Sequence, residues 1–364
     1  MISSATDRSP RFHPLTVAQV RRETADAVSV VFDVPPPLAS AYAFQAGQYL
    51  TLRREIEGAE RRRSYSICAG ADEGVLRIAI KQVDGGLFST WALAELKPGD
   101  VLDVMTPTGR FGPALPAGAG LLHVAIAAGS GITPIVSIAA TVLAREPDSR
   151  FVLLYGSRST ETILFRAVLE DLKDRYLGRF SVVHVLSQEQ QDLSVLSGRL
   201  DAERLDALLR GLTGGARIDH AYVCGPAGMI DAAERVLAAL PAPPGRVHVE
   251  RFTSALDGVP RAPVPVAADA PPHATAAVIH NGARRDVPVA EGEAILDAAL
   301  RAGLDLPYAC KGGMCCTCRA RVTEGAATMA VNYSLERWEE EAGYVLTCQA
   351  RPTTSHIVVD YDTA

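Results

Sequence analysis

Apolar and polar residues alternate over short runs in the first third of the chain, and glycine and proline separate these runs. A period of two places successive side chains on opposite faces of a strand. The runs therefore predict antiparallel strands of a β-barrel or sandwich, at residues 15–20, 28–32, 49–52 and 76–81.

The middle of the chain follows a different pattern, in which an apolar run is followed by an amphipathic helical segment, several times over. Strands are expected at residues 122–127, 151–155, 180–186, 221–224 and 247–252. Helices are expected at residues 134–144, 164–176, 202–209 and 229–240. Such alternation predicts an α/β domain with a parallel sheet.

The last part of the chain has the pattern of a small β-grasp unit. Its strands are expected at residues 276–280, 286–289, 319–322 and 357–360, with a helix at 293–302. Residues 256–272 contain five prolines and no periodic pattern, which is typical of a linker, and a second change of pattern falls at 113–120. The predicted architecture is multidomain: a β-barrel domain at 11–115, an α/β domain at 116–255, the linker at 256–272, and a β-grasp domain at 273–364.

The overall charge is mild and narrows the possible partners. The chain has 364 residues, with 36 Lys and Arg against 42 Asp and Glu, for a net charge of −6. This argues against nucleic acid, which needs a basic surface. The longest apolar stretch, residues 121–144, is interrupted by Gly129, Gly131 and Pro134, so no membrane span is expected.

Cysteine usage suggests metal ligation rather than disulfides. Cys310, Cys315 and Cys318 have the spacing C-x4-C-x2-C, and Cys348 follows after a longer interval. This is the spacing of a plant-type [2Fe–2S] site. The alternative is structural zinc, but zinc sites usually pair two C-x2-C units, and the spacing here favours iron–sulfur. Thiolate ligands point to a reducing compartment, so a cytoplasmic location is expected.

Two further cysteines are interpreted as bystanders. Cys316 lies between two ligands, and the four-cysteine set is complete without it. Cys68 has no partner in the sequence and is expected to be a packed small residue rather than a reactive thiol.

The barrel segment contains residues suited to a flavin nucleotide. Arg63, Tyr65 and Ser66 combine a guanidinium for a pyrophosphate, a ring that can stack on a flat heterocycle and a hydroxyl for a ring nitrogen. The pair Gly85-Gly86 could bring backbone N–H groups against phosphate, with Ser89 as the cap of a following helix. For the glycine pair alone, an ordinary hairpin turn remains open.

The α/β segment opens with a glycine-rich loop between its first strand and helix. The loop Gly129-Ser-Gly131-Ile-Thr133-Pro suits a nucleotide phosphate at a helix N-terminus, although it is not the GxGxxG fingerprint. A tight strand-to-helix turn is the alternative if no second nucleotide signal follows.

Two such signals follow at predicted strand ends, in Tyr155-Gly-Ser157-Arg158 and in Cys224-Gly225-Pro. Ligands of parallel sheets gather at these ends. Ser157 and Arg158 can receive a ribose 2′-phosphate, and no carboxylate is adjacent to them in the sequence. This favours NADPH over NADH.

Taken together, these motifs resemble the ferredoxin–NADP reductase family with a plant-type ferredoxin fused at the C-terminus, over nearly the whole chain. Within it, residues 295–313, 332–336 and 342–350 are similar to reductase components of aerobic phenylacetyl-CoA ring epoxidases. The resemblance implies that Tyr65, Ser66 and Cys224 act at the reacting flavin and nicotinamide rings. It implies cofactor contacts at Arg63, Tyr65, Ser66, Gly85, Gly86, Ser89 and Phe252 for FAD, and at Gly129, Gly131, Thr133, Ser157, Arg158, Cys224 and Gly225 for NADPH.

The implied function is electron transfer from NADPH through FAD and the [2Fe–2S] cluster to a separate oxygenase, by resemblance the di-iron phenylacetyl-CoA epoxidase of aerobic phenylacetate degradation. A reductase for a Rieske-type ring-hydroxylating dioxygenase or another monooxygenase would use the same modules. A zinc-containing redox-sensing or binding protein is the alternative from another class.

Overall fold

The computed structural model describes residues 10–113, 120–241, 245–252, 271–335 and 337–363. The chain divides into a larger unit, Pro14–Arg61 and Tyr65–Phe252, and a smaller unit, Met1–His13, Arg62–Ser64 and Thr253–Ala364. Most of the linker predicted at 256–272, and most of the change of pattern at 113–120, lie outside the described residues. None of the seven cysteines, all of which lie in the described ranges, forms a disulfide bond. No helix in the described ranges is long and apolar enough to cross a membrane.

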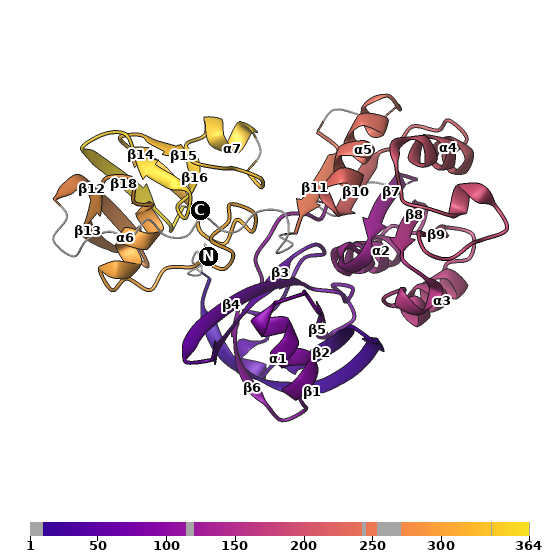
Figure 1. The fold of residues 1–364 in the computed structure, drawn as a ribbon, viewed down its shortest axis with the longest axis horizontal. Coiled ribbons are helices and arrows are strands. Elements are labelled where there is room, and N and C mark those ends of the chain that lie inside the picture. The colour runs from indigo at the N-terminus through magenta and orange to yellow at the C-terminus, as the bar shows by residue number, and fades with distance from the viewer. Residues whose placement is uncertain (1–9, 114–119, 242–244, 253–270, 336, 364) are drawn as a thin grey trace, which may run out of the picture. The chain divides into compact units, whose positions relative to one another are not determined.

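The first sheet is antiparallel and has six strands in the order β4-β3-β6-β1-β2-β5 (Figure 1). A bridge between Ile67 and Ile78 joins the continuation of β4 to β5, the two ends of this order, and so closes the sheet into a barrel. The predicted barrel is confirmed. Its elements are β1 Phe12–Thr24, β2 Ala27–Asp33, β3 Tyr49–Ile56, β4 Ala59–Ser66, β5 Leu76–Lys81, α1 Leu87–Glu95 and β6 Val101–Met105.

Alternating side chains fill the barrel. Val28, Val30 and Phe32 of β2 and Leu50 and Leu52 of β3 are all buried and belong to one apolar cluster. These are every second residue of each strand, as the period of two requires. The sequence pattern missed β6, which is only five residues long. The helix expected at Ser89 is present as α1, but it begins two residues earlier, at Leu87.

The second sheet is parallel, with the order β11-β10-β7-β8-β9, and it confirms the predicted α/β domain. The chain runs outward from β7 through β8 to β9 and then returns to β10 on the other side of β7. In parallel sheets, the crevice that binds ligands lies at the carboxyl ends of the strands where the order reverses, which here are β7 and β10. The elements are β7 Leu122–Ala128, α2 Ile132–Arg145, β8 Arg150–Ser157, α3 Arg166–Arg175, β9 Phe180–Leu186, α4 Ala202–Thr213, β10 His220–Gly225, α5 Ala227–Ala238 and β11 Val247–Arg251.

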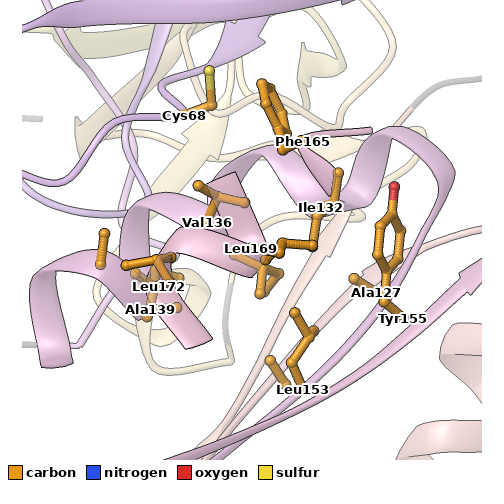
Figure 2. Close-up of a cluster of buried hydrophobic side chains, with 14 of the residues drawn as sticks. Cys68, Ala127, Ile132, Val136, Ala139, Leu153, Tyr155, Phe165, Leu169 and Leu172 are labelled. Carbon is orange, nitrogen blue, oxygen red and sulfur yellow. The ribbon is translucent and has the colours of Figure 1, made fainter. Parts of the chain in front are cut away.

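Apolar clusters cover both faces of this sheet, with α2 and α3 on one face and α4 and α5 on the other. The cluster under α2 and α3 also contains residues of the barrel. Figure 2 shows one of them, Cys68, near Phe165 and Val136. Cys68 is fully buried in this cluster, so the prediction of a packed small residue is confirmed. Burial raises the pKa of its thiol to about 12.

The smaller unit contains a five-stranded sheet in the order β13-β12-β18-β14-β16, in which β12 and β18 are parallel and the other pairs antiparallel. With helix α6 this is the predicted β-grasp unit. Its elements are β12 Pro272–His280, β13 Ala283–Ala290, α6 Ile295–Arg301, β14 Arg319–Glu324, β15 Ala327–Met329, α7 Arg337–Glu341, β16 Tyr344–Leu346, β17 Ala350–Pro352 and β18 His356–Asp360. The short elements β15, α7, β16 and β17 were not predicted, because three to five residues carry no readable period.

Candidate functional site

The glycine loop between β7 and α2 is packed directly against the end of β10. Gly129 has φ +56°, a left-handed conformation that suits glycine. A Cβ at Gly131 would overlap the carbonyl oxygen of Cys224, so only glycine permits this approach. The Tyr155 hydroxyl donates a hydrogen bond of 3.1 Å to the Gly129 carbonyl, and the Thr133 hydroxyl donates within the same turn. The loop is therefore held in place at the crevice by its neighbours.

Three residues that are distant in sequence meet beside this loop. Cys224 and Glu250 are register partners on β10 and β11, and the Ser66 hydroxyl donates a hydrogen bond of 3.4 Å to Oε2 of Glu250. Burial raises the pKa of the Glu250 carboxyl to about 8, although the hydrogen bond from Ser66 opposes this shift. Burial and the neighbouring Glu250 raise the pKa of the Cys224 thiol well above its ordinary value. At neutral pH, therefore, the Cys224 thiol and the Glu250 carboxyl are both mostly protonated and uncharged.

Glu250 was not among the site residues predicted from the sequence. Its only signal was position, because it lies near the carboxyl end of a strand in a parallel sheet, two residues before Phe252. Phe252 follows directly after β11 and packs, partly buried, against the cluster under α2 and α3. Its expected place near a flavin stays a prediction.

The candidate flavin residues lie on β4. Arg63 is exposed and Tyr65 is half-buried, and as residues two apart they share one face of the strand. The Tyr65 ring lies 5.9 Å from the Phe88 ring, between centroids. Ser66 ends the strand and is buried. One surface thus offers a guanidinium and an aromatic ring, next to a buried hydroxyl.

The alternative of an ordinary hairpin turn at Gly85 and Gly86 is excluded, because these residues connect β5 to helix α1. The prediction that Ser89 caps this helix was wrong. The helix begins at Leu87 after the N-cap Gly86, and Ser89 is its third residue. The Ser89 hydroxyl instead donates to the Gly86 carbonyl at 3.0 Å and accepts from the Val83 N–H at 3.1 Å. Ser89 therefore fixes the turn, and the helix N-terminus presents its N–H groups there.

These observations fit a bound FAD. The N-terminus of the nine-residue helix α1 and the exposed Arg63 suit its pyrophosphate. The ring of Tyr65 suits its flat ring system. The glycine loop with Thr133 packs against Cys224 and Gly225 at the carboxyl ends of the parallel strands. There they suit the phosphates and ring of a nicotinamide coenzyme.

Ser157 and Arg158 lie at the end of β8, where the adenosine part of such a coenzyme would reach. No carboxylate is next to Ser157 and Arg158 in the sequence, but the fold brings the carboxylate of Asp26 into contact with Arg158. Oδ2 of Asp26, from the turn between β1 and β2, accepts a 2.9 Å hydrogen bond from Nη2 of Arg158. Lys81 Nζ lies 3.5 Å from the same oxygen.

In the smaller unit, the four predicted cysteine ligands form two pairs. The side chains of Cys310 and Cys315 are hydrogen-bonded neighbours, and so are those of Cys318 and Cys348. No three or more His, Cys, Asp or Glu side chains among the described residues form a group suited to one metal ion. A [2Fe–2S] cluster takes two thiolates on each of two irons, and the two cysteine pairs fit this division.

Donors directed at sulfur support the same interpretation. The Gly312 N–H lies 3.3 Å from Sγ of Cys310, and the Thr317 hydroxyl lies 3.2 Å from Sγ of Cys315. Such hydrogen bonds stabilise thiolate ligands and tune an iron–sulfur centre. Cys316 has φ +51°, and its Sγ donates to Oγ of Ser334 at 3.0 Å. Its predicted role as a bystander remains a prediction.

Comparison with known protein families finds three matches along the chain. Residues 14–112 match an oxidoreductase FAD-binding domain, residues 125–235 an oxidoreductase NAD-binding domain, and residues 278–353 a 2Fe-2S iron-sulfur cluster binding domain.

Individual relatives are similar to this chain over nearly its full length. The chain is 47% identical to a component of the 1,2-phenylacetyl-CoA epoxidase of Escherichia coli, over 96% of this chain and 98% of the relative. It is 33% identical to the ferredoxin reductase component of 3-ketosteroid-9-alpha-monooxygenase from Rhodococcus rhodochrous, over 95% and 96% of the two chains. The solved structure of phthalate dioxygenase reductase shares the fold, with TM-score 0.56 and 22% identity, over 96% of this chain and 98% of the other.

Proposed function

Because the chain belongs to the family of oxygenase reductase components that join FAD-binding, NAD-binding and 2Fe-2S domains, we propose that it delivers electrons from NADPH to a di-iron oxygenase that epoxidises phenylacetyl-CoA. This would make it the reductase of aerobic phenylacetate degradation. The choice of acceptor is supported by the 47% identity to the phenylacetyl-CoA epoxidase component. We also propose a cytoplasmic location and the domain boundaries 11–115, 116–255 and 273–364.

The observation that carries the electron-transfer function is the meeting of Ser66, Cys224 and Glu250 beside the glycine loop. Ser66 and Tyr65 come from the barrel, and Cys224 comes from the parallel sheet, so a flavin on one and a nicotinamide on the other would face each other. When bound, FAD accepts a hydride and gives up electrons singly, which is the chemistry needed to supply a one-electron cluster.

The chain's own residues would position these groups and control charge around them. Arg63 would bind the FAD pyrophosphate, together with the helix N-terminus beyond Gly85 and Gly86 that Ser89 supports. Tyr65 would stack on the flavin ring, and the Ser66 hydroxyl would hydrogen-bond its edge. The Glu250 carboxyl would stay protonated, so that no additional negative charge lies beside the ring that receives the hydride.

The coenzyme would lie across the carboxyl ends of the parallel strands. Its phosphates would contact the loop at Gly129 and Gly131, its nicotinamide would lie by Thr133, Cys224 and Gly225, and Phe252 would lie near the flavin. Ser157 and Arg158 would receive the 2′-phosphate of NADPH. Cys310, Cys315, Cys318 and Cys348 would hold the [2Fe–2S] cluster.

The variant Cys348→Ser tests the order of electron transfer. We expect NADPH to bleach the flavin absorption of this variant at close to the normal rate, because no cysteine of the smaller unit belongs to the hydride site. Reduction of the oxygenase should fall to background. Equal loss of both steps would contradict the proposed order. Cys316→Ser is the matched control and should keep both steps.

The acceptor is tested separately by reconstitution. The purified protein is mixed with phenylacetyl-CoA epoxidase, or with a Rieske-type oxygenase, and substrate turnover is followed with NADPH. Turnover with the epoxidase alone supports the proposal. Turnover only with the Rieske enzyme would retain the reductase function and change its acceptor.

A further inference from the structure

Asp26 lies at an unusual place for a carboxylate in a protein that uses NADPH. Its Oδ2 atom accepts from Nη2 of Arg158 at 2.9 Å, and Nζ of Lys81 lies 3.5 Å from the same oxygen. Two cations therefore share one carboxylate oxygen. This is also how cationic side chains surround a phosphate oxygen.

The carboxylate is held in this position by its own turn. The Thr24 hydroxyl donates to Oδ1 of Asp26 at 2.7 Å, and the Gln82 N–H donates to the Asp26 carbonyl at 2.8 Å. On the other side, the Gln188 N–H donates to the Arg158 carbonyl at 2.8 Å, which anchors that main chain. The contact between carboxylate and guanidinium is thus made by two restrained segments, one from each sheet of the larger unit.

The group is also accessible to a ligand. The exposed fractions of the side chains are 27% for Asp26, 21% for Lys81 and 55% for Arg158. Arg158 follows the last residue of β8, and Gly156 of that strand is the register partner of Ala128, directly before the glycine loop. The cations therefore stand beside the loop that would bind the coenzyme phosphates.

We propose that Asp26 determines how strongly this protein prefers NADPH over NADH, because its carboxylate occupies on Arg158 and Lys81 the place of the coenzyme's 2′-phosphate. This inference rests on the proposed function, in that it assumes a nicotinamide coenzyme at the crevice. It goes beyond that proposal by assigning a residue of the barrel to recognition of the adenosine part.

Charge balance gives the direction of the effect. Asp26, Lys81 and Arg158 together carry one positive charge when no ligand is present. A 2′-phosphate adds about 1.5 to 2 negative charges at pH 7, so it must share two cations with the carboxylate or displace it. NADH has only hydroxyls at this position and leaves the ion pairs undisturbed. Asp26 therefore penalises NADPH selectively and is neutral toward NADH.

The test is calorimetric titration of the full-length holoprotein with adenosine 2′,5′-bisphosphate and adenosine 5′-monophosphate. These probes differ only in the 2′-phosphate and undergo no hydride transfer. In Asp26→Asn, we expect affinity for the bisphosphate to rise about tenfold, as expected for removal of one charge a few ångströms from a phosphate at a solvent-exposed site. Affinity for the monophosphate should change less than about twofold. The gain should shrink as salt is raised.

Two further variants make the result specific. Asp72→Asn removes a similar exposed ion pair that also joins the barrel to the α/β domain, since Asp72 accepts from Arg145 at 2.6 and 2.7 Å. It should leave the ratio of the two affinities unchanged. Adding Arg158→Ala to Asp26→Asn should remove most of the tenfold gain, because the phosphate then lacks its main partner.

An unchanged or lower preference for the bisphosphate in Asp26→Asn, or an equal change for both nucleotides, would overturn the inference. Flavin reduction by NADPH and NADH separates this failure from failure of the proposed function. If neither coenzyme reduces the flavin of the wild-type protein, the proposed function itself fails. If reduction proceeds but Asp26→Asn leaves the preference unchanged, only the role of Asp26 is refuted.

Discussion

Replacement of Glu250 by glutamine should make the larger unit more stable at neutral pH. The pKa of the Glu250 carboxyl is raised to about 8 in the folded chain, against 4.5 for the free group. The folded state therefore binds more protons than the unfolded state between these values. The contribution of Glu250 to stability is complete below about pH 4.5 and is lost as pH rises through 8.

The size of the effect follows from the same two values. At pH 7, which is 2.5 pH units above the pKa of 4.5 of the free carboxyl, keeping Glu250 protonated costs about 3 kcal/mol, at about 1.36 kcal/mol per unit. The side chain retains some contact with solvent, which reduces this cost to about 1–2 kcal/mol. Glutamine has nearly the same shape, accepts a hydrogen bond from Ser66 and carries no charge, so it should recover this energy. For a unit of this size the gain corresponds to about 2–8 °C in Tm.

Thermal unfolding of wild-type protein and Glu250→Gln between pH 5.5 and 8.5 tests this reasoning. Release of bound flavin, followed by its fluorescence, reports on the larger unit. The difference in Tm should be small at pH 5.5 and should grow steadily toward pH 8. Glu189→Gln is the control, because hydrogen bonds from Thr160 lower the pKa of that exposed carboxyl, and no stabilisation is expected. Parallel curves for wild-type protein and Glu250→Gln would refute the raised pKa.

Two further predictions concern packing and charge. Gly131→Ala should lose about 1–3 kcal/mol of stability and bind NADPH more weakly in an equilibrium titration, because the new Cβ would overlap the Cys224 carbonyl. Gly211→Ala, in an open position on α4, should instead raise the free energy of unfolding by about 0.5–1 kcal/mol. Equal effects of the two substitutions would count against the close approach of Gly131 to Cys224. Glu339→Gln should destabilise the smaller unit by about 3 kcal/mol in urea unfolding, because it leaves the buried Arg319 without the carboxylate 2.9 Å from its Nε. A change below about 1 kcal/mol would show that this ion pair is dispensable.

The fold was predictable where a period extended over many residues. Long apolar strands and helices identified the parallel sheet, and alternation identified the barrel. The four cysteines and the glycine loop were readable because ligand spacing and backbone conformation restrict the residue types allowed.

The remaining features depend on contacts between distant segments. Glu250 meets Ser66, and Asp26 meets Arg158, only after two sheets have formed and packed, and nothing local in the sequence marks these pairs. Ser89 was misassigned because a serine near a helix start can cap the helix or bond the preceding turn, and the choice depends on where the helix begins.

The position of Cys348 has a consequence for how the smaller unit matures. Cys318 directly precedes β14, and Cys348 lies two residues after the end of β16. The two strands are antiparallel neighbours, with Arg319 paired to Leu346. If these two cysteines bind one iron, as proposed above, the whole intervening chain must fold back first. Cluster insertion should therefore be a late event that follows the pairing of β14 with β16, and it would lock a strand pair that is distant in sequence.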